Sequence, residues 1–222
     1  MSRPQPPTDR VRVRRQPGRG EYDRAAVHAV LDHGLLGHVA FAERGQPWCI
    51  PMLYARIGDE VYLHGSTGSR AMRTLAGGAP ACLTVTLLDG VVLARSAFEH
   101  SANYRSVMLV GRFHRIEDDA GRLAAFEAFT NRVLPGRWSE VRPPNRKELA
   151  TTVILALPIG EASVKARTGP PSDDDSPDAA ADTWAGVVPI VNRYGQPEPS
   201  PGLRPGIPVA GSVLRLTGSP GR

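Results

Sequence analysis

Short apolar segments separated by turn residues recur between residues 37 and 167, and this rhythm restricts the fold more than any other feature of the chain. Apolar runs of this length, bounded by Gly, Asp and Pro, predict strands, and closely spaced turns favour hairpins between them. Strands are expected at 37–43, 48–56, 61–64, 81–88, 91–98, 106–116, 152–157 and 162–167. Many short strands with few helices predict a mostly β fold: a small closed barrel with flanking helices that cover its openings.

Helix and turn signals divide these strands. Asp23 is placed to cap a helix that Gly34 ends, with apolar residues at helical spacing between them. Similar spacing predicts a helix over 120–134, and a short one from Ser69 to Leu75. The dipeptide Asp89-Gly90 predicts a tight hairpin between the strands on either side.

The basic charge of the chain lies at one end. Residues 1–20 hold six Arg against the single acid Asp9, which accounts for the whole net charge of +5. The rest of the chain is neutral, so we expect a flexible basic arm over 1–20 attached to a neutral body. Nucleic acid is an unlikely partner, because the arm has no aromatic residues for base stacking; backbone contact through the arm stays as the last-ranked alternative.

Composition changes again after residue 167. The stretch 168–222 has ten Pro and eight Gly and includes a run of three Asp, so it has little apolar surface to offset its chain entropy. We therefore predict a folded domain over 21–191 that contains a mobile linker at 168–183, followed by a disordered Pro/Gly-rich tail over 192–222. The patch 184–190 is apolar enough to dock on another part of the fold.

Several classes of protein are excluded. No apolar run is long enough for a membrane helix, and the first residues lack the apolar region of a secretory signal, so we expect a cytoplasmic protein without membrane contact. Cys49 and Cys82 lie far apart, and no histidines have metal-ligand spacing, which argues against a disulfide framework and a metal site. The two cysteines are expected in the core, on strands. No Ser/His/Asp pattern indicates a hydrolase.

The stretch His64–Arg70 is the most informative for chemistry. It leaves a strand, contains two Gly and two Ser, and ends at a helix start with one Arg. Hydroxyls, helix-start N–H groups and an Arg are what a phosphate monoester binds. An ordinary Gly/Ser loop, with Ser69 as a helix cap, explains the same residues.

Two further groups of polar residues have a structural and a functional interpretation. The run 101–106 is rich in hydrogen-bonding side chains before an apolar strand, which suits either a ligand contact or a polar loop with Asn103 in a left-handed turn. Lys165 and Arg167 alternate with apolar residues and therefore share one face of a strand, where they meet an anion or, more commonly, solvent.

Seven stretches in a fixed order resemble one family. Over roughly residues 10–191 the chain is similar to the pyridoxamine 5′-phosphate oxidase-like superfamily, and more narrowly to its flavin-nucleotide-binding branch related to nitroimidazole reductases. The stretches are "LDHGLLGHVAF", "PWCIPMLYAR", "VYLHGSTGSRAMRTL", "ACLTVTLLDGVVLARS", "HSANYRSVMLVGRF", "SVKARTGPP" and "WAGVVPI". The resemblance implies a six-stranded split β-barrel that forms a homodimer, with FMN at the subunit interface.

The resemblance also implies residue roles. His64 is the candidate catalytic residue, as a proton donor to a substrate or a hydrogen-bond partner of the flavin. Ser69 and Arg70 match the pair that holds the FMN phosphate, and 51–53 match the strand that lines the flavin ring. The full cofactor-binding set is Pro51, Met52, Leu53, His64, Gly65, Ser66, Ser69, Arg70, Ser106, Lys165 and Trp184.

Departures from the family pattern narrow the function. The C-terminal substrate-phosphate motif of pyridoxamine phosphate oxidase is missing, so we do not expect oxidation of pyridoxamine phosphate. Haem-degrading relatives have a histidine near the C-terminus, and no histidine follows His114 here, so we do not expect haem as a ligand. The leading hypothesis is an FMN-dependent oxidoreductase that reduces a small nitro- or aromatic-type compound. A deazaflavin-dependent reductase on the same fold is a close alternative, and a non-catalytic flavin-binding or stress-related protein is another. The sequence leaves the substrate and the electron donor open.

Overall fold

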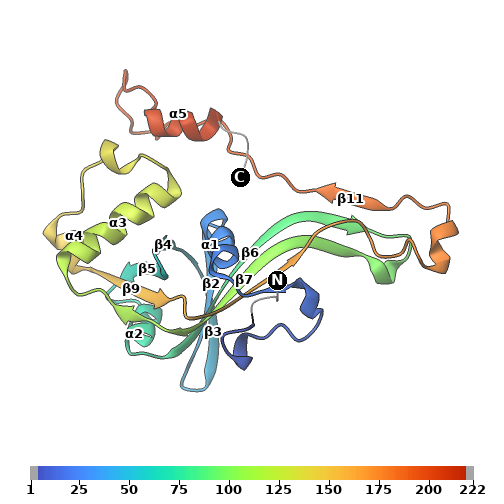
Figure 1. The fold of residues 1–222 in the computed structure, drawn as a ribbon. Coiled ribbons are helices and arrows are strands. Elements are labelled where there is room, and N and C mark those ends of the chain that lie inside the picture. Colours follow the sequence, from blue (N-terminus) through green and yellow to red (C-terminus); the bar gives the residue numbers. More distant parts are fainter. Residues whose placement is uncertain (1–4, 219–222) are drawn as a thin grey trace. The chain divides into compact units, whose positions relative to one another are not determined.

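The computed structural model describes residues 5–218, which form two compact units. Unit 1 holds the described residues up to Met52 together with Pro80–Gly111 and Ile159–Val191, and unit 2 holds Leu53–Ala79, Arg112–Pro158 and the described residues from Asn192 onward. Each unit has its own β-sheet (Figure 1). Residues 1–4 of the expected arm and 219–222 of the expected tail lie outside the described range.

Unit 1 is built on a seven-stranded sheet in the order β1-β10-β7-β6-β2-β3, with β11 paired to β6. The pairs β1–β10, β10–β7, β2–β6 and β11–β6 are antiparallel. The strands are β1 (Gly20–Glu21), β2 (Leu36–Glu43), β3 (Gln46–Leu53), β6 (Pro80–Leu93), β7 (Ser101–Arg112), β10 (Glu161–Arg167) and β11 (Gly186–Pro189). Short 3-10 turns are η1 (Asp9–Val11), η2 (Pro17–Arg19), η3 (Ala97–Glu99) and η5 (Pro177–Ala180).

Helix α1 (Arg24–His33) packs on β6 and β10, as its sequence pattern predicts. The Asp23 carboxylate accepts a hydrogen bond of 2.9 Å from the backbone N–H of Ala26, which satisfies one of the free donors of the first turn. Val27, Val30 and Leu31 are buried on the face toward the sheet. The local capping signal and the apolar spacing therefore place this helix correctly.

The predicted hairpin at Asp89-Gly90 is wrong, because β6 continues through it as one strand of 14 residues. Asp89 is held by two hydrogen bonds from Arg105 on β7, at 2.7 and 3.0 Å. Gly90 pairs with Pro189 of β11, and a Cβ there would lie 3.0 Å from Val187 and 3.1 Å from the carbonyl oxygen of Val188. Glycine is therefore present for the close approach of β11 and not for a turn.

Unit 2 is built on a four-stranded sheet in the order β4-β5-β9-β8. The strands are β4 (Ala55–Ile57), β5 (Glu60–Ser66), β8 (His114–Arg115) and β9 (Thr152–Pro158), and the helices are α2 (Arg70–Ala76), α3 (Asp119–Val133), α4 (Arg146–Ala150) and α5 (Gly211–Gly218), with η4 at Trp138–Glu140. Val153–Leu157 of β9 are all buried and form the centre of the unit, since α2 and α4 pack on this strand.

The mostly β fold with flanking helices is confirmed, while the number of six barrel strands stays a prediction. The cysteines lie on strands, as expected, but the expectation of core positions is wrong for Cys49, which is exposed because β3 is the edge of its sheet. Cys82 on β6 is half-buried. Within residues 5–218 no helix has the length and apolar character needed to cross a membrane.

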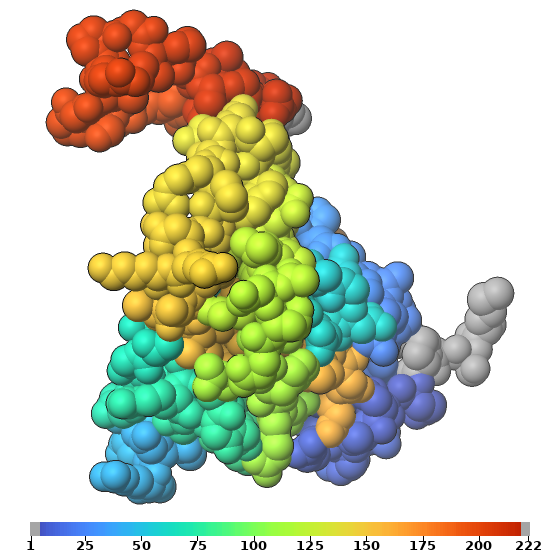
Figure 2. All heavy atoms as spheres, turned by 90° about the vertical axis from the view of Figure 1, so that its left-hand side faces the viewer, coloured from blue at the N-terminus to red at the C-terminus, as the bar shows by residue number. Residues whose placement is uncertain are grey.

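The segments outside the sheets make specific contacts. Val11 of the expected arm is buried, and Arg10 and Thr8 both bond to Glu161 of β10. In the expected linker, the Asp173 side chain is fully buried against Arg95. In the tail, Ser212 donates to Glu140, and Figure 2 shows this red segment against the yellow one around residue 140. Composition alone does not reveal these contacts because they join residues far apart in the chain.

Candidate functional site

The end of β5 and the start of α2 bring five of the expected site residues together. Ser66 organises the loop, because its side-chain oxygen accepts from the N–H of Gly68 at 3.1 Å and its carbonyl from the N–H of Ser69 at 3.0 Å. The Ser69 side chain caps α2 by accepting from the N–H of Met72. Ser66 and Arg70 are exposed, so hydroxyl and guanidinium donors stand at the mouth of this loop.

The loop therefore satisfies both interpretations of its sequence. Ser69 is an ordinary helix cap, as the structural explanation requires. Its hydroxyl hydrogen remains available as a donor, because the cap uses the oxygen only as an acceptor. Together with Arg70, the loop offers what a phosphate group binds: a fixed positive charge and several hydrogen-bond donors.

His64 lies beside this loop in an apolar setting. Its ring meets that of Phe129 edge to face at 4.4 Å between centroids and lies 6.1 Å from that of Phe126, both on α3. Nδ1 is buried and has no hydrogen-bond partner among the described residues. Burial lowers the pKa of His64 below its ordinary value of 6.5, because the charged imidazolium is poorly solvated there. In either tautomer of the neutral ring, Nδ1 is left without a hydrogen-bond partner among the described residues.

Gly65 has a packing role that the sequence does not reveal. A Cβ at this position would lie 2.7 Å from Cγ and 3.1 Å from Sδ of Met72, whose side chain is almost fully buried. The absence of a side chain lets α2 pack closely on β5. This contact is a structural reason for glycine after His64, and the cofactor contact that the resemblance implies for Gly65 stays a prediction.

The residues expected to line a flavin ring lie on an edge strand. Pro51 is exposed, Met52 is half-buried and 47% of Leu53 is exposed, all at the end of β3. Trp184 precedes β11 and is 66% exposed. Its ring packs close to the backbone of Gly186, where a Cβ would lie 2.9 Å from the indole. Ser106 and Lys165, two other residues of the expected cofactor-binding set, line a cavity in unit 1. Trp184 is not among the residues that line it.

Ser106 and Lys165 are brought together directly. They are register partners on β7 and β10, and the Ser106 hydroxyl donates to the Lys165 carbonyl at 3.1 Å. Both line a cavity of about 320 Å³, and the segment Val11–Arg15 lines it as well. Sequence reasoning missed this wall. The alternation Arg-Val-Arg-Val-Arg over 10–14 is the signal that could have shown it, since one set of side chains turns inward and the other outward.

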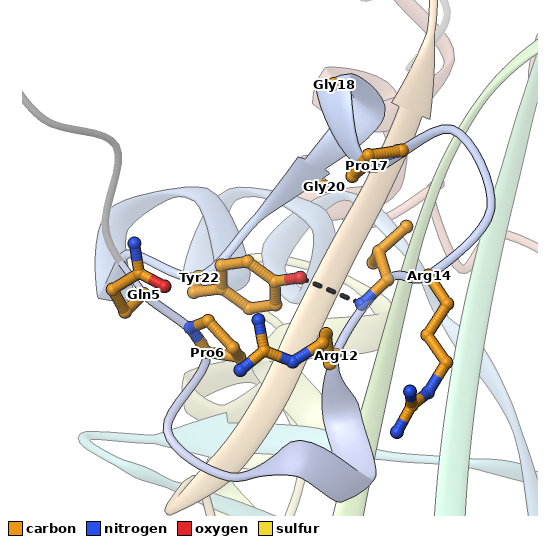
Figure 3. A pocket seen from close by; sticks show the side chains of 9 residues that line it. Gln5, Pro6, Arg12, Arg14, Pro17, Gly18, Gly20 and Tyr22 are labelled. Carbon is orange, nitrogen blue, oxygen red and sulfur yellow. Dashed lines mark hydrogen bonds between the residues drawn. The ribbon is translucent and has the colours of Figure 1, made fainter.

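A second cavity, of about 550 Å³, lies on the same segment (Figure 3). Arg12 and Arg14 line it, together with Tyr22, whose hydroxyl accepts from the N–H of Val13 at 2.8 Å. Figure 3 shows the segment crossing in front of β10, and the contacts of η1 and η2 with that strand agree. The Arg-rich segment therefore forms the walls of two cavities in unit 1.

The remaining polar candidates have structural roles. Arg167 is buried and donates to the Asn103 side chain at 2.5 Å and to the carbonyl of Pro170 at 2.8 Å, so neither solvent nor a ligand is its partner. Asn103 lies on β7 in place of the left-handed turn considered from sequence. Between residues 5 and 218, no group of three or more His, Cys, Asp and Glu side chains is placed to hold a metal ion.

Comparisons with known proteins identify relatives of the whole chain. The family model described as pyridoxamine 5′-phosphate oxidase matches residues 23–166. A flavocytochrome from Azotobacter vinelandii is 42% identical, with a TM-score of 0.90 and coverage of 96% of this chain and 99% of that one. A FAD- and haem-binding protein from Mycobacterium smegmatis is 46% identical, with a TM-score of 0.86 and coverage of 90% and 97%.

A more distant structure shares the fold alone. It is a protein assigned to 5-nitroimidazole antibiotic resistance from Bacteroides thetaiotaomicron, 16% identical, with a TM-score of 0.54 and coverage of 64% of this chain and 83% of that one. Among the curated proteins, none matches the chain.

Proposed function

Because the chain belongs to the pyridoxamine 5′-phosphate oxidase family, we propose that it is a redox protein that binds both a flavin and haem. The two structures that it resembles at 42% and 46% identity are named as a flavocytochrome and as a FAD- and haem-binding protein. The observation in this chain that carries the proposal is Nδ1 of His64, which is buried and has no hydrogen-bond partner in the part of the chain that the structure describes.

His64 fits the needs of a haem ligand. Haem iron takes a neutral imidazole nitrogen, and burial keeps His64 neutral at pH 7 because it lowers the pKa. Phe126 and Phe129 supply apolar surface of the kind that a porphyrin packs against. The sequence argued against haem because no histidine follows His114. Coordination by His64 does not need a histidine near the C-terminus, so the proposal replaces that expectation.

The loop after His64 fits the phosphate of a flavin nucleotide. Arg70 supplies the positive charge, and Ser66 and Ser69 supply hydroxyl donors that the loop already holds in place. FMN was the flavin expected from sequence and a deazaflavin the alternative. FAD joins them, because one relative is named for it.

These residues bind and orient the cofactors, while the flavin and haem, once bound, supply the electron transfer. Arg70 and the two serines anchor a phosphate without touching a reacting ring. The Phe rings exclude water from one side of His64 and hold its ring in one orientation, which favours a single ligand geometry. The neutral His64 offers a lone pair at a fixed place instead of a proton.

The test is the visible absorption spectrum of the full-length protein purified from haem-supplemented cells, with the extracted flavin identified by chromatography. We expect flavin bands together with a haem Soret band. His64→Ala should lose the Soret band, and added imidazole should restore it by filling the vacated position. His38→Ala, at an exposed position on β2, is the matched control and should keep the band. A wild-type protein that takes up neither cofactor would contradict the proposal, and an unchanged Soret band in His64→Ala would exclude this ligand.

Reduction of a small nitro- or aromatic-type compound, the leading hypothesis from sequence, is the second candidate. It is supported by the sequence resemblance, and it assigns His64 a role as proton donor. The imidazole-rescue experiment distinguishes the two roles of His64, as haem ligand and as proton donor. Binding to the iron changes the absorption spectrum, and proton donation does not. We also propose that the protein forms a homodimer and lies in the cytoplasm. The non-catalytic alternative, in which the flavin binds without turnover, remains open to the same tests.

A further inference from the structure

The positive charge of this protein is concentrated on one exposed segment of unit 1. The segment 9–21 has five Arg and two acidic residues, which gives it a net charge of +3. From residue 22 onward the chain has 21 basic and 20 acidic residues, so the rest of the protein is nearly neutral. The side chains are 63% exposed at Arg10, 46% at Arg12 and 70% at Arg14, and Arg15 is exposed as well.

The segment is held on the sheet and does not behave as a free arm. Val11 is 1% exposed, and the backbone N–H of Val13 donates to the hydroxyl of Tyr22 at 2.8 Å. Arg10 donates to Glu161 of β10 at 3.0 Å. The backbone that carries the exposed guanidinium groups is therefore fixed, and a partner that docks on it has less conformational entropy to remove.

The segment also lies beside residues that we expect at the flavin. Val11–Arg15 lines one cavity together with Ser106 and Lys165, which the resemblance places in the cofactor-binding set. A protein that docks on the exposed side of this segment would stand next to the expected cofactor. Such closeness is what electron transfer between two proteins requires.

We propose that the segment 9–21 docks the acidic surface of a one-electron carrier protein that reduces the flavin. This inference rests on the proposed function, in which the electron donor is open. Opposite charges speed the encounter of two proteins, and the interfaces of electron-transfer complexes are small. Each encounter moves one electron from the reduced carrier to the flavin. Two encounters supply the two electrons of full reduction, and water supplies the protons.

Two other polyanions match the segment less well. Single-stranded nucleic acid stacks on aromatic side chains between the basic ones, and the segment 9–21 has no aromatic residue. A stable contact with an anionic membrane needs an apolar anchor in addition to basic residues. Val11 is buried and Val13 is half-buried, so the apolar residues of the segment are turned to the fold. An acidic protein surface needs neither feature.

The experiment uses a plant-type ferredoxin as the acidic probe. Calorimetry measures the binding of oxidised ferredoxin to the full-length protein, and stopped-flow absorption measures the reduction of bound flavin by reduced ferredoxin. Both the affinity and the rate constant should fall as the salt concentration rises. The double variant Arg14→Glu/Arg15→Glu should lower both by at least about tenfold, because it reverses two exposed charges at the interface.

Two further variants control for folding and for total charge. Arg15→Gln leaves the bonds of Arg12 and Arg14 to Asp9 in place and should act in the same direction as the double variant. Arg193→Glu/Arg204→Glu reverses two exposed charges in the tail and should stay within about twofold of wild type.

The outcomes separate this inference from the proposed function. It is overturned if ferredoxin does not bind, or if the Arg14→Glu/Arg15→Glu protein binds ferredoxin as wild type does. Tighter binding of a duplex oligonucleotide or of anionic lipid vesicles at the same salt concentration would also overturn it. Ferredoxin that binds through Arg14 and Arg15 to a protein that takes up no flavin would support the docking surface and contradict the proposed function.

Discussion

The imidazole of His64 and the ring of Phe129 meet edge to face at 4.4 Å between their centroids, with 64° between the ring planes. His64 lies on β5 and Phe129 on α3, so this contact joins the strand that leads into the loop Ser66–Arg70 to a helix far along the chain. Because the contact is apolar on the Phe129 side, it contributes to the burial that lowers the pKa of His64.

This lowered pKa makes the stability of the cofactor-free protein depend on pH. Near pH 6 the unfolded chain binds more protons at His64 than the folded chain does, so the free energy of unfolding falls as pH drops through the ordinary value of 6.5. Urea unfolding at pH 7.5 and 5.5 should show a larger loss for wild type than for His64→Gln, which does not titrate. Equal losses in the two proteins would show that His64 is not the titrating group.

Arg70→Ala should weaken flavin binding by about 10–100-fold, because it removes a charged donor to the phosphate. The measurement is a fluorescence titration of flavin-free protein. Arg73→Ala is the matched control, an exposed cation one turn along the same helix, and should bind flavin as wild type does. If Arg70→Ala keeps full affinity, the phosphate site lies elsewhere.

Gly65→Ala should destabilise the protein by about 1–3 kcal/mol, since the new methyl group overlaps the buried Met72 side chain at 2.7 Å. Gly68→Ala is the control in the same loop, because its Cβ would meet no atom closer than 3.6 Å. Urea unfolding of the two variants measures the difference. Equal stabilities would mean that α2 shifts freely to make room.

Asp173→Ala should release the segment 168–183. The Asp173 carboxylate is fully buried and accepts from both the backbone N–H and the guanidinium of Arg95, so its loss should cost about 1.5–3 kcal/mol. Asp174 bonds to the same guanidinium at 2.9 Å but is 67% exposed, and Asp174→Ala should cost under about 1 kcal/mol. Limited proteolysis should cut the first variant faster within 168–183, and equal cleavage rates would contradict this role.

Elements with local signals were predicted from sequence. The Asp23 cap and the apolar spacing after it specify α1, and the spacing around 120–134 specifies α3, observed at Asp119–Val133. A local signal for α4 was overlooked: Asn145 and Glu148 form a capping box at its start. The loop Ser66–Arg70 could be proposed as a phosphate site from sequence because its hydroxyls, glycine and Arg follow one another in the chain.

Elements that depend on distant partners were not predicted. Asp89-Gly90 has the composition of a hairpin, but it lies inside one continuous strand, where Arg105 and β11 bond to it. The segment 11–15 has the composition of a free arm, but it lies over β10 and lines a cavity with Lys165. In each case the deciding contact comes from a residue far away in the sequence.

The sequence by itself determined the mostly β architecture, the first helix and the loop between β5 and α2 that we propose as the phosphate site, because backbone geometry, capping and turn chemistry act over a few residues. Only the tertiary structure decided that Nδ1 of His64 is buried beside Phe129 with no hydrogen-bond partner among the described residues, and that Lys165 and the segment Val11–Arg15 line one cavity. Burial and the lining of a cavity are properties of what surrounds a side chain, and the surroundings exist only once distant strands and helices have packed together.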